Sequence, residues 1–167
     1  IVSPRHVHRP MELTSLMRDL VNAGHKVHTT IQRYEARPAS AQEADILTVA
    51  EGALIVHIER TRFADDEPIA VLTNLIPADI APTMQELESG SLYDLMREHG
   101  VILASARQVI GARSATVKEA ALLSERRGAA LLTTQRTTYD PSGRIVECGD
   151  HIYRASRYSF EASLFAQ

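Results

Sequence analysis

Two arginines separated by a single residue are the clearest candidates for chemistry in this sequence. Over residues 53–63 the residue types alternate as they do in a β-strand, so Arg60 and Arg62 share one face. Their guanidinium groups would lie about 7 Å apart, and each offers donors in a fixed geometry that suits a phosphate or a carboxylate. The same pattern also fits a solvent-exposed strand face on which both arginines pair with nearby acids.

A second candidate lies near the C-terminus, between Glu147 and Tyr158. Alternation places Glu147, Gly149, His151 and Tyr153 on one strand face, where they could line a polar pocket. The carboxylate would accept hydrogen bonds from hydroxyl groups, and the tyrosine would stack or donate. An edge strand with a mixed surface would show the same alternation.

Hydroxyl side chains form the third candidate. Ser91 stands at the start of a predicted helix, where free backbone amides and a partial positive charge favour an anion. Thr29 and Thr30 could add hydroxyls to the same anion. The alternatives are an ordinary helix cap for Ser91 and a plain strand start for the two threonines.

Metal and nucleophile chemistry are not predicted. The pairs His6/His8 and His25/His28 lack a cysteine or an acid at ligand spacing. Nucleotide-binding glycine motifs and the serine-nucleophile motif are absent, and Cys148 has no evident base. We therefore expect no metal, no cofactor and no catalytic residue.

Hydrophobic periodicity and turn residues predict the elements that carry these side chains. The predicted helices cover residues 11–23, 40–50, 84–87, 91–98 and 116–128. The predicted strands cover residues 27–37, 53–63, 69–76, 101–113, 130–139, 144–154 and 158–162. This mixture of hairpins and helices is typical of an α+β domain.

The chain contains an internal repeat. A shift of 76 positions aligns ten identical pairs within 33 positions, where about two or three are expected by chance. The shift also aligns two capping boxes, Ser40–Glu43 and Thr116–Glu119. We therefore predict two strand–helix–hairpin units that share one sheet, with a ligand cleft favoured where the units meet.

Composition narrows the class of protein. The 167 residues suit one domain, and a single cysteine excludes an intrachain disulfide and favours a reducing, cytoplasmic setting. No apolar run is long enough to span a membrane. The net charge of −3 is the wrong sign for a module that coats a phosphate backbone.

Several segments resemble the UTRA domain, the effector-binding domain of HutC-type regulators in the GntR superfamily. Residues 60–70, RTRFADDEPIA, resemble that family's R-x-R-x-x-D-G-x-P-x-A hairpin. Residues 147–158 resemble its closing pattern, an E followed by Y-R-x-D-R-Y. Residues 13–24 are similar to its opening helix, and residues 91–93 to its S-L-Y segment.

The resemblance implies a chorismate-lyase-like fold over residues 1–167 as a single effector-binding domain. It further implies a homodimer, and operator DNA bound by an N-terminal winged helix that this chain lacks. By position, Arg60, Arg62 and Ser91 would hold the anionic group of a small effector. Glu147 and Tyr153 would contact its polar body, and Arg154 or Arg157 would brace the site.

Two positions depart from the family pattern. The return strand has Leu72 where sugar-phosphate sensors often have glutamate, and Ser156 replaces the aspartate before the last arginine. This argues against an amino-sugar phosphate and leaves other phosphorylated metabolites or a small carboxylic acid as effector. The alternative functions are a chorismate-lyase-like enzyme and a dimerisation module with a vestigial pocket.

Overall fold

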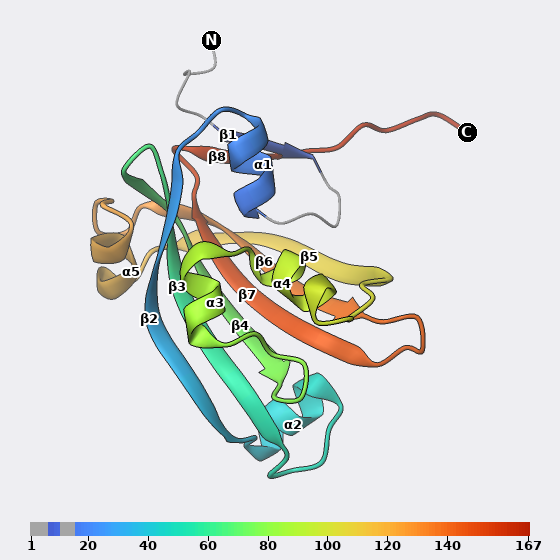
Figure 1. Ribbon diagram of the computed structural model, residues 1–167. Coiled ribbons are helices and arrows are strands. Elements are labelled where there is room, and N and C mark those ends of the chain that lie inside the picture. Colours follow the sequence, from blue (N-terminus) through green and yellow to red (C-terminus); the bar gives the residue numbers. More distant parts are fainter. Residues whose placement is uncertain (1–6, 11–15) are drawn as a thin grey trace.

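A computed structural model describes residues 7–10 and 16–167. Its centre is an antiparallel sheet of six strands in the order β2-β3-β4-β7-β6-β5, which twists strongly across its width (Figure 1). The α+β class and the antiparallel sheet with flanking helices are thereby confirmed. The strands are β2 (Val27–Pro38), β3 (Leu54–Ala64), β4 (Glu67–Pro77), β5 (Ser105–Ser114), β6 (Ala130–Tyr139) and β7 (Ile145–Arg154).

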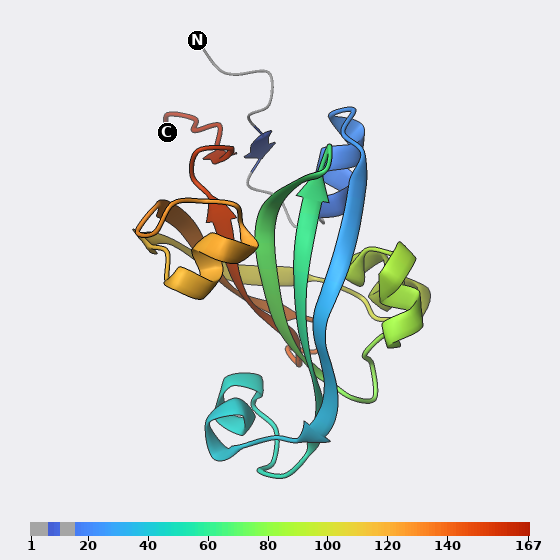
Figure 2. The same ribbon diagram turned by 90° about the vertical axis from the view of Figure 1, so that its left-hand side faces the viewer.

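Helices cover both faces of this sheet (Figure 2). They are α1 (Leu16–Asn22), α2 (Ala41–Leu47), α3 (Met84–Ser89), α4 (Leu92–Glu98) and α5 (Val117–Leu122). On one face, α3 and α4 pack on Val56, Ile58 and Ile76. On the other, α5 packs near Val71 and α2 near Leu75. We call these the α3–α4 face and the α2–α5 face.

The predicted repeat is visible as two matching corners. In the first, Arg37 donates two 2.7 Å hydrogen bonds to Glu43, whose carboxylate also accepts from the Ser40 amide. In the second, Arg113 donates two 2.7 Å bonds to Glu119, which accepts from the Thr116 amide. Each corner therefore uses one glutamate both to cap a helix and to hold the preceding strand.

The return strands, however, do not follow the 76-residue shift. The first turn has two residues, Asp65 and Asp66, both with positive φ, whereas the second has three and ends at Gly143 with φ 85°. Strand pairing consequently relates β4 to β7 by 77 positions, so Ile69 corresponds to Val146 rather than to Ile145. The predicted alignment was wrong there because one extra turn residue displaces the strand that follows.

Two boundaries also differ from prediction. Residues 101–104 are not a strand, because the Val101 amide bonds the Met96 carbonyl and Val101 packs against the α3–α4 cluster. The predicted first helix is α1, and the part predicted at 11–15 lies outside the described residues.

A second, two-stranded sheet lies beside the main one. It pairs β1 (Val7–Pro10) with β8 (Tyr158–Glu161) in parallel, which confirms the short last strand (Figure 1). Tyr158 packs with Leu20 and Tyr153 in a common apolar cluster, so this sheet is anchored to the main core. Within the described residues, no helix is long and apolar enough to cross a membrane.

Candidate functional site

Arg60 and Arg62 are buried on the α3–α4 face, each with only 2% of its surface exposed. They lie on β3 opposite Leu72 and Ala70 of β4, in the interior of the sheet. The alternative of a solvent-exposed strand face is therefore wrong. Burying a charged group is costly unless it is paired, so these two side chains require a specific explanation.

The hydrogen bonds of the two guanidinium groups are incomplete. Arg60 donates from Nη2 to Asn74 Oδ1 at 3.0 Å, and Arg62 donates from Nη1 to Thr29 Oγ1. Nε and Nη1 of Arg60 and Nε of Arg62 are buried and have no hydrogen-bond acceptor among the described residues. Three N–H-bearing nitrogens thus remain available to an anion that would enter this part of the structure.

The electrostatics of the pair favour an added negative charge. Burial lowers the pKa of Arg60 to about 10 and the pKa of Arg62 to about 9. The charge of Arg60 further lowers the pKa of Arg62, and no carboxylate offsets it. Both groups still carry a proton at neutral pH, so both remain cations in a poorly solvated environment.

Glu147 is the acidic member of the same face and is fully buried. Its carboxylate accepts hydrogen bonds from Asn74 at 2.7 Å, Tyr93 at 3.0 Å and Thr138 at 3.1 Å. Burial raises the pKa of Glu147, and these hydrogen bonds partly offset that effect. Burial, followed by the charge of Glu147, also raises the pKa of Tyr93.

Asn74 connects the acidic and basic parts of the face. Its amide nitrogen lies 3.3 Å from Nε2 of His151, whose Nδ1 lies 3.2 Å from the Tyr153 hydroxyl. Gly149 is paired with Asn74, and a Cβ there would lie 2.8 Å from both Glu147 Oε1 and His151 Nε2. A side chain at this position would therefore displace Glu147 and His151, and glycine leaves room for the three polar side chains to meet as they do.

Arg136 is a further cation of this face. Its Nε donates to Gln108 at 2.7 Å, and its Nη1 lies 3.4 Å from the Tyr93 hydroxyl. We call the whole set the polar cluster; it comprises Arg60, Arg62, Asn74, Tyr93, Arg136, Thr138, Glu147, His151 and Tyr153. Sequence reasoning did not name Asn74, Tyr93, Arg136 or Thr138 as site residues, although the repeat aligns Arg136 with Arg60 and could have indicated it.

Several predicted residues join this cluster or border it. Glu147, His151 and Tyr153 share one face of β7 as predicted, and Tyr153 also stacks on Tyr158 at 4.3 Å. Thr29 reaches Arg62. Ser91 precedes the helix that carries Tyr93, makes no capping bond, and has a buried hydroxyl without a partner among the described residues.

Other predicted residues lie elsewhere. Thr30 pairs with Thr61 in register, on the opposite side of β2 from Thr29, and is exposed. Arg154 donates to Glu125 at 2.9 Å and to the Pro68 carbonyl at 3.0 Å. Strand alternation points these side chains away from the polar cluster, so their predicted place in one site with Arg60 was wrong.

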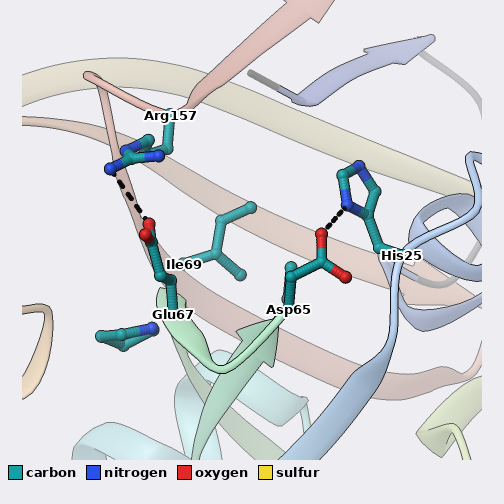
Figure 3. Close-up of a pocket in the computed structure, with 7 residues that line it drawn as sticks. His25, Asp65, Glu67, Ile69 and Arg157 are labelled. Carbon is teal, nitrogen blue, oxygen red and sulfur yellow. Dashed lines mark hydrogen bonds and ion pairs between the residues drawn. The ribbon is translucent and has the colours of Figure 1, made fainter. Parts of the chain in front are cut away.

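Arg157 lines a separate pocket at the tip of the β3–β4 hairpin (Figure 3). There it forms a 3.0 Å ion pair with Glu67, while His25 and Asp65 lie 2.6 Å apart on the other side. The pocket holds about 140 Å³. Arg157 thus contacts the hairpin that follows Arg62 rather than the polar cluster itself.

The two departures from the family pattern have clear positions. Leu72 is buried between Arg60 on β3 and His151 on β7, at the centre of the α3–α4 face. Ser156 donates to Glu125 at 2.6 Å, next to Arg154. Only Leu72 therefore bears on the polar cluster.

The described residues contain no group of three potential metal ligands. Of the histidines considered, His25 pairs with Asp65 and His28 stacks on Phe63 with ring centres 4.4 Å apart. His6 lies outside the described residues.

Comparison with known proteins identifies this arrangement. The profile of the UTRA domain matches residues 22–159. The chain belongs to the UTRA domain family. It is 31% identical over 150 residues to the HTH-type transcriptional repressor NagR of Bacillus subtilis, an alignment that covers 89% of this chain and 62% of NagR.

Solved structures agree on the UTRA fold. The effector domain of PhnF from Mycobacterium smegmatis superposes with a TM-score of 0.88 at 23% identity, over 96% of this chain and 100% of that one. A Streptomyces coelicolor protein, proposed to be a transcriptional regulator, is 47% identical with a TM-score of 0.76, over 86% and 96% of the chains. The homologues of this UTRA chain are GntR-family transcriptional regulators, and the fold is the chorismate-lyase-like fold of their effector domains.

The chain spans between 35% and 62% of the lengths of the curated relatives that it matches. These relatives carry names as transcriptional regulators or repressors.

Proposed function

We propose that this UTRA domain binds a small anionic metabolite at the polar cluster and thereby controls the DNA binding of a transcription regulator. The observation that carries the proposal is the pair of buried arginines whose donors lack acceptors. A bound anion would supply those acceptors, and charge-assisted hydrogen bonds of this kind contribute about 1.5–3 kcal/mol each.

The charge of the cluster favours a dianion. Three guanidinium groups, those of Arg60, Arg62 and Arg136, are buried on this face, and Glu147 is the only acid of the cluster. Even with Glu147 ionised, two positive charges remain without a counter-charge among the described members of the cluster. A phosphate monoester or phosphonate would balance them, whereas a monocarboxylate would balance one.

Leu72 restricts what surrounds the anionic group. A glutamate there would lie between Arg60 and His151 and would compete with the ligand for the arginine. A leucine leaves the cation free and removes an acceptor for hydroxyl or amino groups. We therefore favour a phosphorylated metabolite without an amino group over an amino-sugar phosphate.

The cluster is suited to binding rather than to catalysis. Glu147, its only carboxylate, already accepts from three donors, and both ring nitrogens of His151 have polar neighbours. A general base needs a free lone pair within hydrogen-bond reach of the substrate. Three of the about four acceptor sites of the Glu147 carboxylate and both ring nitrogens of His151 are already engaged, and this supports a binding role over a chorismate-lyase-like activity.

Regulation would require that the anion bind one arrangement of the regulator more tightly than another. A preference of about 1–3 kcal/mol is typical of such coupling. We further propose that the regulator is a homodimer, and that its DNA contacts come from the part of its relatives that this chain does not span. The HTH-type names of NagR and PhnF support this division of roles.

A thermal-shift screen tests the proposal. Inorganic phosphate, phosphosugars and phosphonates are compared with monocarboxylates, on the wild type and on an Arg60→Ala/Arg62→Ala variant. A dianion at one hundred times its Kd should add about 2.7 kcal/mol to the stability of the wild type. The variant should give no shift while circular dichroism shows an intact fold. An equal shift in both proteins, or none with any anion, would refute the site.

A further inference from the structure

Two adjoining cavities lie on the α2–α5 face of the sheet. Helices α2 and α5 cover opposite ends of this face (Figure 2), and the cavities between them hold about 420 Å³ and 240 Å³. Thr73 and Asp150 line both cavities, which therefore meet over the middle of the sheet. We call the two cavities together the trough. Its size suits a small organic molecule.

The middle of the trough is a row of polar residues from three strands. Thr73 of β4 is paired with Asp150 of β7, and Asp150 is paired with Gln135 of β6. Directly paired residues have neighbouring side chains on one face, so the three side chains lie next to one another. None of them makes a side-chain hydrogen bond or an ion pair among the described residues. The row is therefore available to a ligand.

Asp150 is the carboxylate of the trough that has no ion pair among the described residues. The other three carboxylates of the lining each pair with an arginine; the pairs are Glu43 with Arg37, Glu59 with Arg33 and Glu119 with Arg113. Lys118 of α5 also lines the trough but forms no ion pair with Asp150. Partial burial raises the pKa of Asp150; the charge of Arg113 opposes this effect and the charge of Glu119 adds to it. A cation beside Asp150 would supply the missing counter-charge.

His57 contributes a hydrogen-bond donor to the same lining. Its Nδ1 lies 3.1 Å from Nη2 of Arg37, and because a guanidinium can only donate, the ring proton must be on Nε2. This Nε2 is buried and has no acceptor among the described residues. Burial, followed by the charges of Arg33 and Arg37, lowers the pKa of His57, so the ring is neutral at neutral pH. A ligand oxygen that reaches Nε2 would supply the missing acceptor.

We propose that the trough binds a small organic amine. Its ammonium group would donate to Asp150, and an oxygen at its other end would accept from His57. These residues are two strands and two positions apart, so their Cα atoms are separated by about 12 Å. Two hydrogen bonds of about 2.8 Å each leave a span that a five-carbon chain covers. That chain would lie on the apolar part of the lining, which comprises Ile46, Leu75 and Cys148.

The trough is separate from the polar cluster, although both use the same strands. Asp150 lies between Gly149 and His151 of β7, and Thr73 precedes Asn74 of β4. Side chains alternate between the faces of a sheet, so the backbone of the sheet lies between the two sites. The amine would therefore occupy a second site, and this proposal does not depend on the anion site.

A nuclear magnetic resonance titration with 5-amino-1-pentanol tests the proposal. On the wild type we expect saturable shifts of the Asp150 and His57 signals, with a Kd in the millimolar range that suits so small a ligand. Pentane-1,5-diol lacks the ammonium group and should bind at least about tenfold more weakly, and pentylamine, which lacks the oxygen, should lose less. Equal affinity for the diol would overturn the amine class, and equal affinity for pentylamine would overturn the role of His57. No saturable shift with any of the three would overturn the site.

Variants locate the bound amine. Asp150→Asn should lower the affinity for 5-amino-1-pentanol at least about tenfold. Asp45→Asn removes an exposed carboxylate of α2 outside the lining and should leave the affinity unchanged. The Arg60→Ala/Arg62→Ala variant should bind the amine as the wild type does, and Asp150→Asn should keep the phosphate-induced thermal shift, so failures of the two sites are distinguishable. Unchanged affinity in Asp150→Asn, or an equal loss in Asp45→Asn, would overturn the proposal.

Discussion

In both halves of the sheet, an arginine near the end of an outer strand donates two hydrogen bonds to the glutamate that caps the following helix. The distances in the Arg37–Glu43 and Arg113–Glu119 corners are the same, 2.7 Å. The strand faces that these corners support are different. Arg60 matches Arg136, but Arg62 matches Thr138, and Asn74 matches His151 once the extra turn residue is counted.

The comparison indicates what each part of the repeat does. The corners fix where helices and hairpins begin, and this requirement is the same in both halves. The polar cluster lies where the halves meet, at the β4–β7 pairing, and is assembled from residues that differ between them. The surplus positive charge comes from the first half, which contributes two arginines, while the second contributes one arginine and the compensating Glu147.

The largest expected effect is on anion affinity, when Arg62 is replaced by an uncharged residue and the two halves no longer differ in charge at this position. Arg62→Met deletes a cation that no carboxylate offsets, so affinity for a phosphate dianion should fall at least about a hundredfold. The unliganded domain should not lose stability and should gain up to about 1–4 kcal/mol, because an apolar side chain replaces a buried charge. Isothermal titration and urea unfolding measure the two quantities.

Thr138→Val, at the matching position of the second half, is the control for Arg62→Met. It removes a 3.1 Å hydrogen bond to Glu147 but no anion donor, so affinity should change less than about fivefold. Equal losses of affinity in the two variants would show that the halves contribute alike and would contradict the assignment.

A smaller effect is expected at Gly149, which matches Leu72 of the first half. A methyl group at Gly149 would lie 2.8 Å from Glu147 Oε1 and His151 Nε2. Gly149→Ala should therefore displace these side chains and lower the free energy of unfolding by about 1–3 kcal/mol. Urea denaturation measures this free energy. Gly128→Ala serves as a comparison, because there the destabilisation would come from backbone strain at φ 77° and not from crowding. A Gly149→Ala domain as stable as wild type would mean that the cluster is loosely packed.

The sequence was sufficient to predict which site residues share a face of the same strand. Strand alternation alone grouped Arg60 with Arg62 and Glu147 with His151 and Tyr153. It could not reach Asn74, because the contact of Asn74 with Glu147 spans 73 positions and depends on which strands are neighbours. The resemblance placed Arg154 and Arg157 at the same site, yet their contacts with Glu125 and Glu67 lie off that face.

The register of the second half was missed for a local reason. The identity of Ile69 and Ile145 suggested one constant shift, whereas turn length decides which residues of β7 face the cluster. The capping boxes, by contrast, were predicted correctly because each is contained within four residues and needs no distant partner.

The smallest effect concerns the corners and tests whether they are equivalent. Glu43→Gln and Glu119→Gln each remove one ion pair and weaken one capping box, so each should cost about 1 kcal/mol. Hydrogen bonds from the neighbouring arginine lower the pKa of each glutamate to about 2, from an ordinary value of 4.5. A lowered pKa means that the stabilisation is fully present above about pH 4.5 and is lost as the pH falls through about 2. The stability difference between wild type and either variant should therefore be constant from pH 7 to pH 5 and shrink at lower pH, in urea titrations at each pH. If the loss of unfolding free energy follows the same pH dependence in both variants, the two corners are equivalent. A loss in only one variant would show that the two corners share a geometry but stabilise the fold unequally.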